Sequence, residues 1–250
     1  MDMTAAIEKR ISCRAYADRP LEADKLSALE ALVDALNAES GLHFQLYGPR
    51  AEGQDAISMS AAMFSGPVYC YAALAAPADI LSGEKVGYYG ERLVLEATAM
   101  GLGTCWVAGT YDQKTTRVVL AEGEKLWDVV PIGYAAAKTP LKQKTIRAAI
   151  RAKGRKAEQM AESDAPWEKL PEWFREGVRA VEMGPSAVNR QPVVLRWKGG
   201  KITAGLRTTE YDLVYNDLGI AKLHFELAAA EKGVRGHWED GVDGEFVYQA

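Results

Sequence analysis

The sequence predicts an α+β fold in which antiparallel-rich sheets are flanked by helices. Three observations indicate this class: short β-rich runs lie between longer amphipathic runs, glycines end the two longest amphipathic runs, and one pair of strands turns at adjacent glycines. The chain has 250 residues, of which 48% are hydrophobic and 26% are charged. These fractions are ordinary for globular proteins, so we expect a buried core.

The first part of the chain alternates helical and β-rich runs. Apolar residues at helical spacing from Leu26 to Leu36 follow Pro20, which favours a helix start. Two later runs are rich in β-formers, and a second helical run stops at Gly101 and Gly103. The predicted elements are a helix within 18–38, strands within 43–48 and 67–76, a helix within 87–103 and a strand within 128–136.

The second part begins after a charged segment. Residues 138–167 carry many charges and few large apolar side chains, which predicts a connector on the surface. Adjacent Gly199 and Gly200 separate two β-rich runs, as in a two-residue hairpin turn. The elements predicted beyond the connector are an amphipathic helix within 170–184, a hairpin within 191–207 and a helix within 217–238 that is stopped by glycine.

The two longest predicted helices can be aligned with each other, which suggests a diverged duplication. The alignment pairs Gly87 with Gly219, Leu93 with Phe225, Ala97 with Ala229, Gly101 with Gly233, Leu102 with Val234 and Trp106 with Trp238. Each half would then contain a helix, one or more strands, a long central helix and a further strand. Two amphipathic helices that end in glycine can also match by chance, and this alternative stays open.

Composition argues against several classes of protein. The net charge of −4 offers no broad attraction to nucleic acid or anionic lipid, so neither is expected as a partner. Three widely separated cysteines, Cys13, Cys70 and Cys105, favour neither a disulfide framework nor a metal site, and they fit a reducing cytoplasm. We expect no export signal at the N-terminus and no membrane span, because no apolar run is long enough.

The segment "KRISCR" precedes the first long helix and carries two guanidinium groups and a hydroxyl. Arg10, Ser12 and Arg14 could together surround a phosphate monoester, since arginine supplies donors in a fixed fork. The alternative is a solvated basic N-terminus. Residue types alone do not separate the two interpretations.

The segment "GPSAVNRQP", residues 184–192, offers donors and acceptors on a backbone stiffened by Pro185 and Pro192. The side chains of Ser186, Asn189 and Gln191 could meet the mixed donor and acceptor edge of a heteroaromatic ring. A turn that merely joins a helix to a strand is the alternative.

Two further segments are weaker candidates. In "GLGTCWVAGTYD", Gly109 could bring a backbone N–H close to a ligand, whereas the alternative is a helix cap and loop. In "KGRK", residues 153–156, a second phosphate contact competes with an ordinary charged linker.

The order of these segments resembles that in the nitroreductase family of FMN-dependent oxidoreductases. "KRISCR" is similar to the family's R-R-S-x-R phosphate and ribityl contact, and "GPSAVNRQP" is similar to its A-P-S-x-x-N-x-Q-P flavin-ring loop. The resemblance covers essentially the whole chain and points to the subfamily named putative TM nitroreductases. It implies a nitroreductase-like fold and FMN contacts from Arg10, Ser12, Arg14, Ala108, Gly109, Lys153, Arg155, Pro185, Ser186, Ala187, Asn189 and Gln191.

The resemblance also implies how the chain is organised. Family members are usually homodimers in which one subunit supplies the phosphate motif and the other supplies the ring loop. Here the two motifs lie in different parts of one chain, which implies two fused halves, 1–150 and 151–250, intertwined as one structural unit. Such a chain would bind one FMN and act as a monomeric pseudo-dimer or a weak homo-oligomer.

The chemistry implied by the resemblance is hydride transfer from NAD(P)H to N5 of FMN, followed by reduction of a small-molecule acceptor such as a nitroaromatic or a quinone. The sequence contains no obvious general acid or base for this reaction. His43, His224 and His237 are expected to be structural or surface residues, and Cys105 a small buried apolar residue. Two alternatives stay open: a non-catalytic flavin-binding or sensory protein, and an α+β protein that binds no cofactor.

Overall fold

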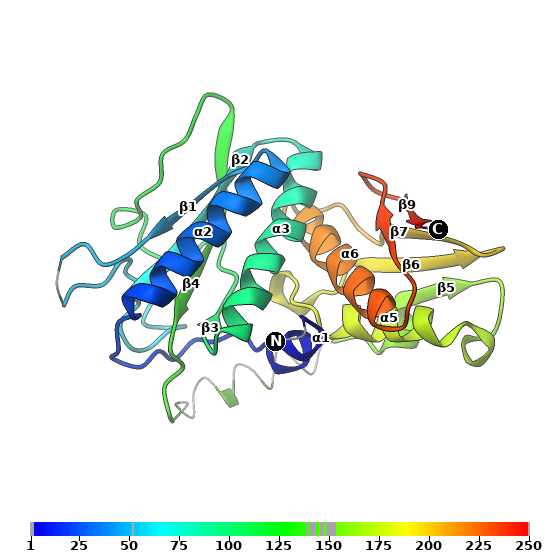
Figure 1. Cartoon of the computed structure of the whole chain (residues 1–250), viewed down its shortest axis with the longest axis horizontal. Helices are drawn as coiled ribbons and strands as arrows, with labels where there is room; N and C mark the ends of the chain where they lie inside the picture. The colour runs from blue at the N-terminus through cyan, green and yellow to red at the C-terminus, as the bar shows by residue number, and fades with distance from the viewer. Residues whose placement is uncertain are drawn as a thin grey trace. The chain divides into compact units, whose positions relative to one another are not determined.

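The computed structural model describes residues 3–51, 53–138, 140, 144–145, 148 and 154–249 (Figure 1). Its architecture is α+β, as predicted. The chain divides into two compact units: unit 1 comprises Lys9–Ala78 and Arg92–Ala149, and unit 2 comprises Asp2–Glu8, Asp79–Glu91 and Ile150–Ala250. The predicted halves, 1–150 and 151–250, describe two family-like repeats rather than compact units. This division into repeats stays a prediction.

Unit 1 is built on a four-stranded antiparallel sheet with the strand order β1-β2-β4-β3. Its elements are α2 (Ala23–Ser40), β1 (His43–Tyr47), β2 (Cys70–Pro77), the C-terminal part of α3 (Ile80–Ala99), β3 (Gly103–Thr104) and β4 (Glu124–Gly133). Strand β2 has a neighbour on each side and is buried from Cys70 to Ala76. This burial explains why its sequence is continuously apolar.

The helix predicted within 18–38 is α2. It begins after Pro20 and ends at Gly41, whose φ of 72° lies in the left-handed region that favours glycine. The Gly41 N–H donates to the carbonyl oxygen of Asn37 and so satisfies one of the last carbonyls of the helix. The buried residues of α2 are Leu29, Val33 and Leu36. Their spacing confirms the predicted helical periodicity.

Unit 2 is built on a five-stranded sheet with the strand order β5-β6-β7-β9-β8. Its elements are most of α1 (Met3–Lys9), the N-terminal part of α3, η1 (Ala157–Met160), β5 (Ala161–Ser163), η2 (Trp167–Lys169), α5 (Glu172–Met183), η3 (Ala187–Asn189), β6 (Val193–Lys198), β7 (Lys201–Leu206), α6 (Val214–Glu231), β8 (Gly236–Trp238) and β9 (Gly244–Tyr248). The predicted hairpin is β6 and β7. It turns at Gly199 and Gly200, whose φ values of 57° and 86° suit a type I′ turn.

An aromatic core holds α5 and α6 together in unit 2. Phe174 of α5, Phe225 of α6 and Phe246 of β9 are fully buried. The ring centroids of Phe174 and Phe225 are 5.8 Å apart, and those of Phe225 and Phe246 are 5.4 Å apart. Such edge-to-face pairs hold α5 against α6. The 184–192 loop begins at the end of α5 and contacts α6.

The connector predicted over 138–167 is wrong in its last part. Residues 157–163 form η1 and β5, and β5 pairs in parallel with β6. Ala157 and Met160 are only 6% and 1% exposed. The few apolar side chains of this charged stretch therefore pack in the core of unit 2. The overall composition of the stretch does not reveal this packing.

The predicted boundaries of the two long helices also differ from the structure. Helix α3 begins at Ile80, before the predicted start at residue 87. Helix α6 ends at Glu231, and residues 236–238 form β8 instead of continuing the helix. Gly233, with a φ of 81°, reverses the chain after α6, as its predicted role as a stop requires.

Helices α3 and α6 approach each other through paired glycines in unit 2. A Cβ placed on Gly87 would lie 2.0 Å from the carbonyl oxygen of Asn216, and one placed on Gly219 would lie 1.9 Å from that of Glu84. The alignment of the two helices pairs Gly87 with Gly219, and the same offset pairs Glu84 with Asn216. The two contacts are therefore images of each other, as at a two-fold interface. The duplication itself stays a prediction.

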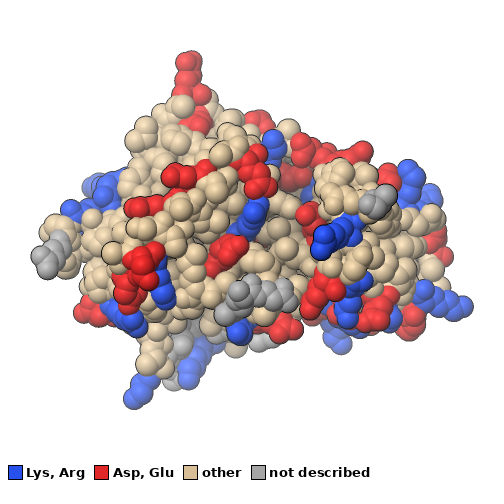
Figure 2. Space-filling view, viewed as in Figure 1, with Lys and Arg blue, Asp and Glu red and all other residues tan. Residues whose placement is uncertain are grey.

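The surface shows no dominant charge on the face drawn in Figure 2. Lysine and arginine side chains are interspersed with aspartate and glutamate, and neither sign covers a continuous area of that face. Among the helices that the structure describes, none combines the length and apolar character needed to cross a membrane.

Candidate functional site

The loop 184–192 connects α5 to β6 and has an unusual backbone. Val188, Asn189 and Gln191 have φ values of 53°, 54° and 46°, in the left-handed region that non-glycine residues rarely adopt. The turn η3 lies within the loop. Backbone strain of this kind persists only where the surrounding structure maintains it. It is concentrated at ligand and active sites.

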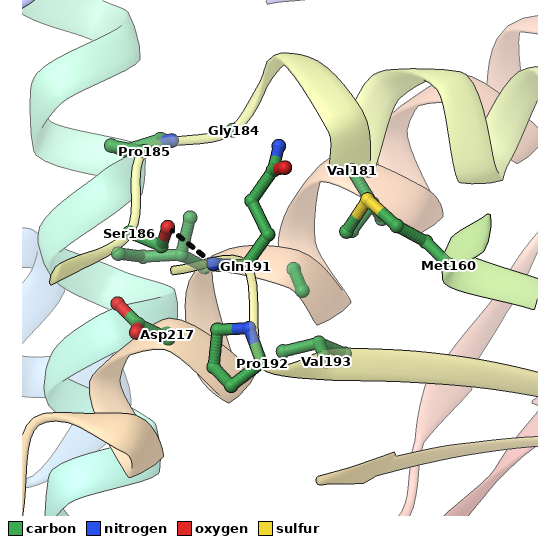
Figure 3. A pocket seen from close by; sticks show the side chains of 11 residues that line it. Met160, Val181, Gly184, Pro185, Ser186, Gln191, Pro192, Val193 and Asp217 are labelled. Carbon is green, nitrogen blue, oxygen red and sulfur yellow. Dashed lines mark hydrogen bonds between the residues drawn. The ribbon is translucent and has the colours of Figure 1, made fainter. Parts of the chain in front are cut away.

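Gln191 anchors the loop from inside. Its side chain is 4% exposed, its Nε2 donates to the carbonyl oxygen of Glu182 at 2.9 Å, and its Oε1 accepts from the N–H of Arg155. Its own N–H donates to Oγ of Ser186 at 3.0 Å (Figure 3). The predicted contact of Gln191 with a ring stays a prediction, and the structure assigns this amide a supporting role in the loop.

Arg155 is brought to the loop by its backbone and its side chain. Besides the N–H bond to the Gln191 amide, its Nε donates to the carbonyl oxygen of Gln191 at 3.3 Å. Residue Arg155 of the basic segment therefore meets the loop in unit 2, and it is exposed there. Lys153, the other candidate in this segment, lies outside the described residues.

Asp217, which the sequence analysis did not single out, lies under the loop. It is 4% exposed, and its Oδ1 accepts from the N–H of Ala187 at 2.9 Å while its Oδ2 accepts from the hydroxyl of Tyr211 at 3.0 Å. Burial raises the pKa of this carboxyl to about 7, against the opposing effects of the Ala187 N–H, the Tyr211 hydroxyl and the charge of Arg190. Its position in the first turn of a helix was the available signal, but the contact depends on the tertiary fold.

A small cavity lies beneath the loop. It measures about 10 Å³ and is lined by Pro185, Ser186, Gln191 and Asp217 together with apolar side chains (Figure 3). This volume corresponds to about one water molecule. A three-ring cofactor cannot enter it, so we expect ligand contacts from the outer side of the loop, where Val188 is 64% exposed.

The phosphate-type segment lies in unit 1, beside β3. Ser12 forms a parallel bridge with Thr104, and the N–H of Cys13 donates to the Thr104 carbonyl oxygen at 2.7 Å. Arg10, Ser12 and Arg14 are half-buried. Their position along a strand edge makes this segment part of the folded unit and excludes the solvated-tail interpretation.

The two arginines and the serine all influence one buried thiol. Burial raises the pKa of Cys105, while the charges of Arg14 and Arg10 and the hydroxyl of Ser12 lower it. All three candidate residues therefore act on the same thiol group. Cys105 is 3% exposed, which confirms the expected small buried residue.

Ala108 and Gly109 follow Val107, which pairs with Val129 of β4. Both are exposed. A Cβ placed on Gly109 would meet no atom within 4 Å, so the packing of unit 1 does not require glycine there. The predicted reason for this glycine, close approach to a ligand, stays a prediction.

The first part of the chain has no equivalent of the 184–192 loop. Helix α2 is joined to β1 by Gly41 and Leu42 alone, whereas α5 is joined to β6 by the whole of 184–192. The ring-loop motif therefore occurs once among the described helix-to-strand connections of this kind. The stoichiometry of one flavin per chain stays a prediction.

The three histidines are structural or surface residues, as expected, and His237 is exposed on β8. His224 is fully buried, with Nδ1 2.9 Å from the carbonyl oxygen of Ala180 and Nε2 2.9 Å from Oε1 of Glu91. His43 lies 2.9 Å from Glu124 at the surface of unit 1. The three cysteines are buried and free, and no metal-ligating cluster occurs within the described part of the chain.

Comparison with known proteins gives one match along the sequence and several in structure. The family model described as "Putative TM nitroreductase" matches residues 2–229. A putative nitroreductase from Thermotoga maritima is 22% identical and superimposes with a TM-score of 0.66 over 99% of this chain and 93% of its own. This similarity shows that the fold is nitroreductase-like.

Two shorter proteins match less closely. A nitroreductase family protein from Clostridium difficile 630 is 18% identical, with a TM-score of 0.46 over 68% of this chain and 100% of its own. An FMN-dependent nitroreductase from Clostridium difficile R20291 is 16% identical, with a TM-score of 0.41 over 54% of this chain and 88% of its own. No curated protein matches the sequence.

Proposed function

The chain belongs to the family of putative TM nitroreductases, and from this premise we propose that it is an FMN-dependent oxidoreductase. In this proposal NAD(P)H donates a hydride, and a nitroaromatic, quinone or similar small molecule accepts the electrons. The observation that carries the proposal is the match of residues 2–229 to the family, together with two segments that resemble its flavin motifs in the expected order. Bound FMN would supply the redox chemistry, and the chain would bind and orient it.

The residues of unit 1 fit the phosphate end of FMN. Arg10 and Arg14 each carry a positive charge that acts on the Cys105 thiol, and Ser12 adds a hydroxyl. All three are half-buried, which strengthens charge-assisted hydrogen bonds relative to those in water. A phosphate monoester is the part of FMN that needs such donors.

The residues of unit 2 fit a polar ring edge. Ser186 uses its oxygen to accept from Gln191, and its hydroxyl hydrogen can still turn toward a ligand. Asn189 is half-buried at the strained part of the loop. Val188, Asn189 and Gln191 are held in a backbone conformation that costs energy, as expected of a preorganised ligand contact.

The proposal is tested by the spectrum of the purified protein. We expect a flavin spectrum after reconstitution with FMN, bleaching by NAD(P)H without oxygen, and recovery on addition of a quinone or nitroaromatic. Bound flavin that never bleaches would support a non-catalytic flavin-binding protein instead. Colourless protein that takes up no FMN would overturn the proposal.

The substitution Arg14→Ala is expected to weaken FMN binding without unfolding the chain. Loss of one charge-assisted phosphate contact should cost about 1.5–3 kcal/mol, or roughly a ten- to hundredfold loss of affinity. A fluorescence titration with FMN measures the change. The matched control is Arg92→Ala, which removes a partly exposed arginine that pairs with Glu39 in unit 1. Equal affinities of the two variants would remove Arg14 from the site.

The substitution Asn189→Ala is expected to change the flavin's surroundings more than its retention. A hydrogen bond to a neutral ring edge contributes about 0.5–1.5 kcal/mol, less than a phosphate contact, but it can favour one redox state. We therefore expect a shifted visible spectrum or reduction potential with most FMN retained. Spectra and potentials are measured beside Arg14→Ala in the same buffer. Wild-type values for affinity, spectrum and potential in folded Asn189→Ala would make this asparagine a turn residue only.

A further inference from the structure

The strained part of the 184–192 loop needs support from outside itself. Val188, Asn189 and Gln191 all have positive φ, and a β-branched residue such as Val188 is a clear outlier in that region. Such a backbone persists only where neighbouring contacts determine it. The hydrogen bonds at the two ends of the segment show which contacts these are.

The C-terminal end is held by groups whose charge does not change near neutral pH. The Gln191 side chain donates to the Glu182 carbonyl and accepts from the Arg155 N–H, and the Gln191 N–H donates to Ser186 Oγ. Amides, carbonyls and a hydroxyl make all of these bonds. The support at this end therefore stays the same between pH 6 and pH 8.

The N-terminal end is held by a carboxylate. The N–H of Ala187 donates to Oδ1 of Asp217, which lies 30 residues further along, on α6. The other carboxylate oxygen accepts from Tyr211, whose ring lies under the guanidinium of Arg190 at 4.6 Å. This buried carboxylate thus ties the start of the strained segment to the first turn of α6.

We propose that Asp217 is the positioning residue of the 184–192 loop, whose carboxylate holds the Ala187 backbone and thereby keeps Ser186 and Asn189 in their ligand-binding arrangement. The inference rests on the proposed function in taking the flavin ring as the ligand. Asp217 touches the loop rather than the ligand, so its effect is on the arrangement of the donors. The assignment of Asp217 extends the site beyond the residues that the family motif contains.

The support supplied by Asp217 changes with pH near neutrality. Burial raises the pKa of the carboxyl to about 7, so it is mainly protonated at pH 6 and mainly ionised at pH 8. The ionised form accepts the Ala187 N–H more strongly, because a charge-assisted hydrogen bond is stronger than a neutral one. The loop is therefore held more firmly at pH 8. The charge of Arg190 acts on Asp217, and the titratable Tyr211 donates its hydroxyl to it. Glu84 on the adjacent helix α3 pairs with Lys222.

Global stability changes in the opposite direction. The folded-state pKa of Asp217 is above its ordinary value of 3.8, so the unfolded chain loses this proton first as the pH rises. The stability contributed by the protonated carboxyl is complete below pH 4 and is lost as the pH rises to about 7. At pH 8 the loop is therefore held more firmly while the whole fold is less stable than at pH 6. These opposite changes distinguish local positioning of the loop from a general effect on stability.

The first test is amide hydrogen exchange at Ala187 in the ligand-free chain, corrected for the intrinsic effect of pH. We expect roughly three- to tenfold greater protection at pH 8 than at pH 6 in the wild type. Asp217→Ala should lower protection at both values. Asp217→Asn, which keeps an oxygen acceptor without the charge, should restore part of it and abolish the pH dependence. Asp212→Asn, which changes an exposed carboxylate nearby, is the control and should behave as the wild type.

The second test is titration with FMN at the same two pH values. The wild type should gain affinity from pH 6 to pH 8 beyond the change in Asp217→Asn, which corrects for titration of the phosphate itself. If FMN never binds but the exchange pattern holds, the proposed function fails and the positioning role stands. If FMN binds and Ala187 exchanges in Asp217→Ala as in the wild type, the positioning role is overturned and the proposed function stands.

Discussion

Lys222→Met is expected to lower the free energy of unfolding by about 3–5 kcal/mol, the range for removing one partner of a buried ion pair. Nζ of Lys222 lies 2.6 Å from Oε1 of Glu84, and the two side chains are 1% and 6% exposed. The same Nζ donates to the carbonyl oxygens of Glu239 and Gly241. Methionine fills similar space but leaves the Glu84 carboxylate buried without its cation.

Urea unfolding, followed by far-UV circular dichroism, measures this loss. The double variant Lys222→Met with Glu84→Gln should recover part of the stability, because glutamine removes the unpaired charge and still accepts from the Gly241 N–H. Lys201→Met is the matched control, since Lys201 forms an exposed pair with Glu245 that contributes about 0–1 kcal/mol. A Lys222→Met variant as stable as Lys201→Met would show that the pair adds nothing to the fold.

Gly219→Ala is expected to destabilise unit 2 by about 3 kcal/mol or more, although alanine is the better helix former. The added Cβ would lie 1.9 Å from the Glu84 carbonyl oxygen and 2.6 Å from the Tyr88 nitrogen. Both are backbone atoms, so α3 and α6 would have to separate to accept the methyl group. Gly87→Ala should have a similar effect, because its Cβ would lie 2.0 Å from the Asn216 carbonyl oxygen.

The matched control for the two helix glycines is Gly109→Ala. Its Cβ would meet no atom within 4 Å, and its φ is not in the left-handed region. We expect a change within about 0.5 kcal/mol in the absence of ligand. Thermal unfolding of the three variants side by side makes the comparison. If Gly219→Ala unfolded at the control's temperature, the close crossing of the two helices would be disproved.

Elements whose limits depend on adjacent residues could be predicted from the sequence. Gly41 ends α2 because a residue with positive φ must follow the helix, and Gly199 and Gly200 turn the hairpin for the same reason. The apolar run of β2 identified a buried strand. In each case, the physical cause acts over a few residues and can be recognised in the order of amino acids.

Elements that depend on distant partners could not be predicted in this way. Strand β5 exists because Ala161 pairs beside Leu195 in β6, and a short charged run carries no sign of that pairing. Helix α3 begins at Ile80, and its N-terminal part belongs to unit 2 because Gly87 packs on Asn216. Both depend on contacts between segments far apart in the chain.

The candidate site divides in the same way. The order of residue types in "KRISCR" and "GPSAVNRQP" was enough to indicate the family and the two segments proposed to bind FMN, because those motifs are local. Tertiary structure alone turned the Gln191 amide inward and placed Asp217 on the Ala187 N–H, 30 residues away. Burial raises that carboxyl's pKa to about 7, and burial is a property of the packed fold, which a linear pattern of residues does not specify.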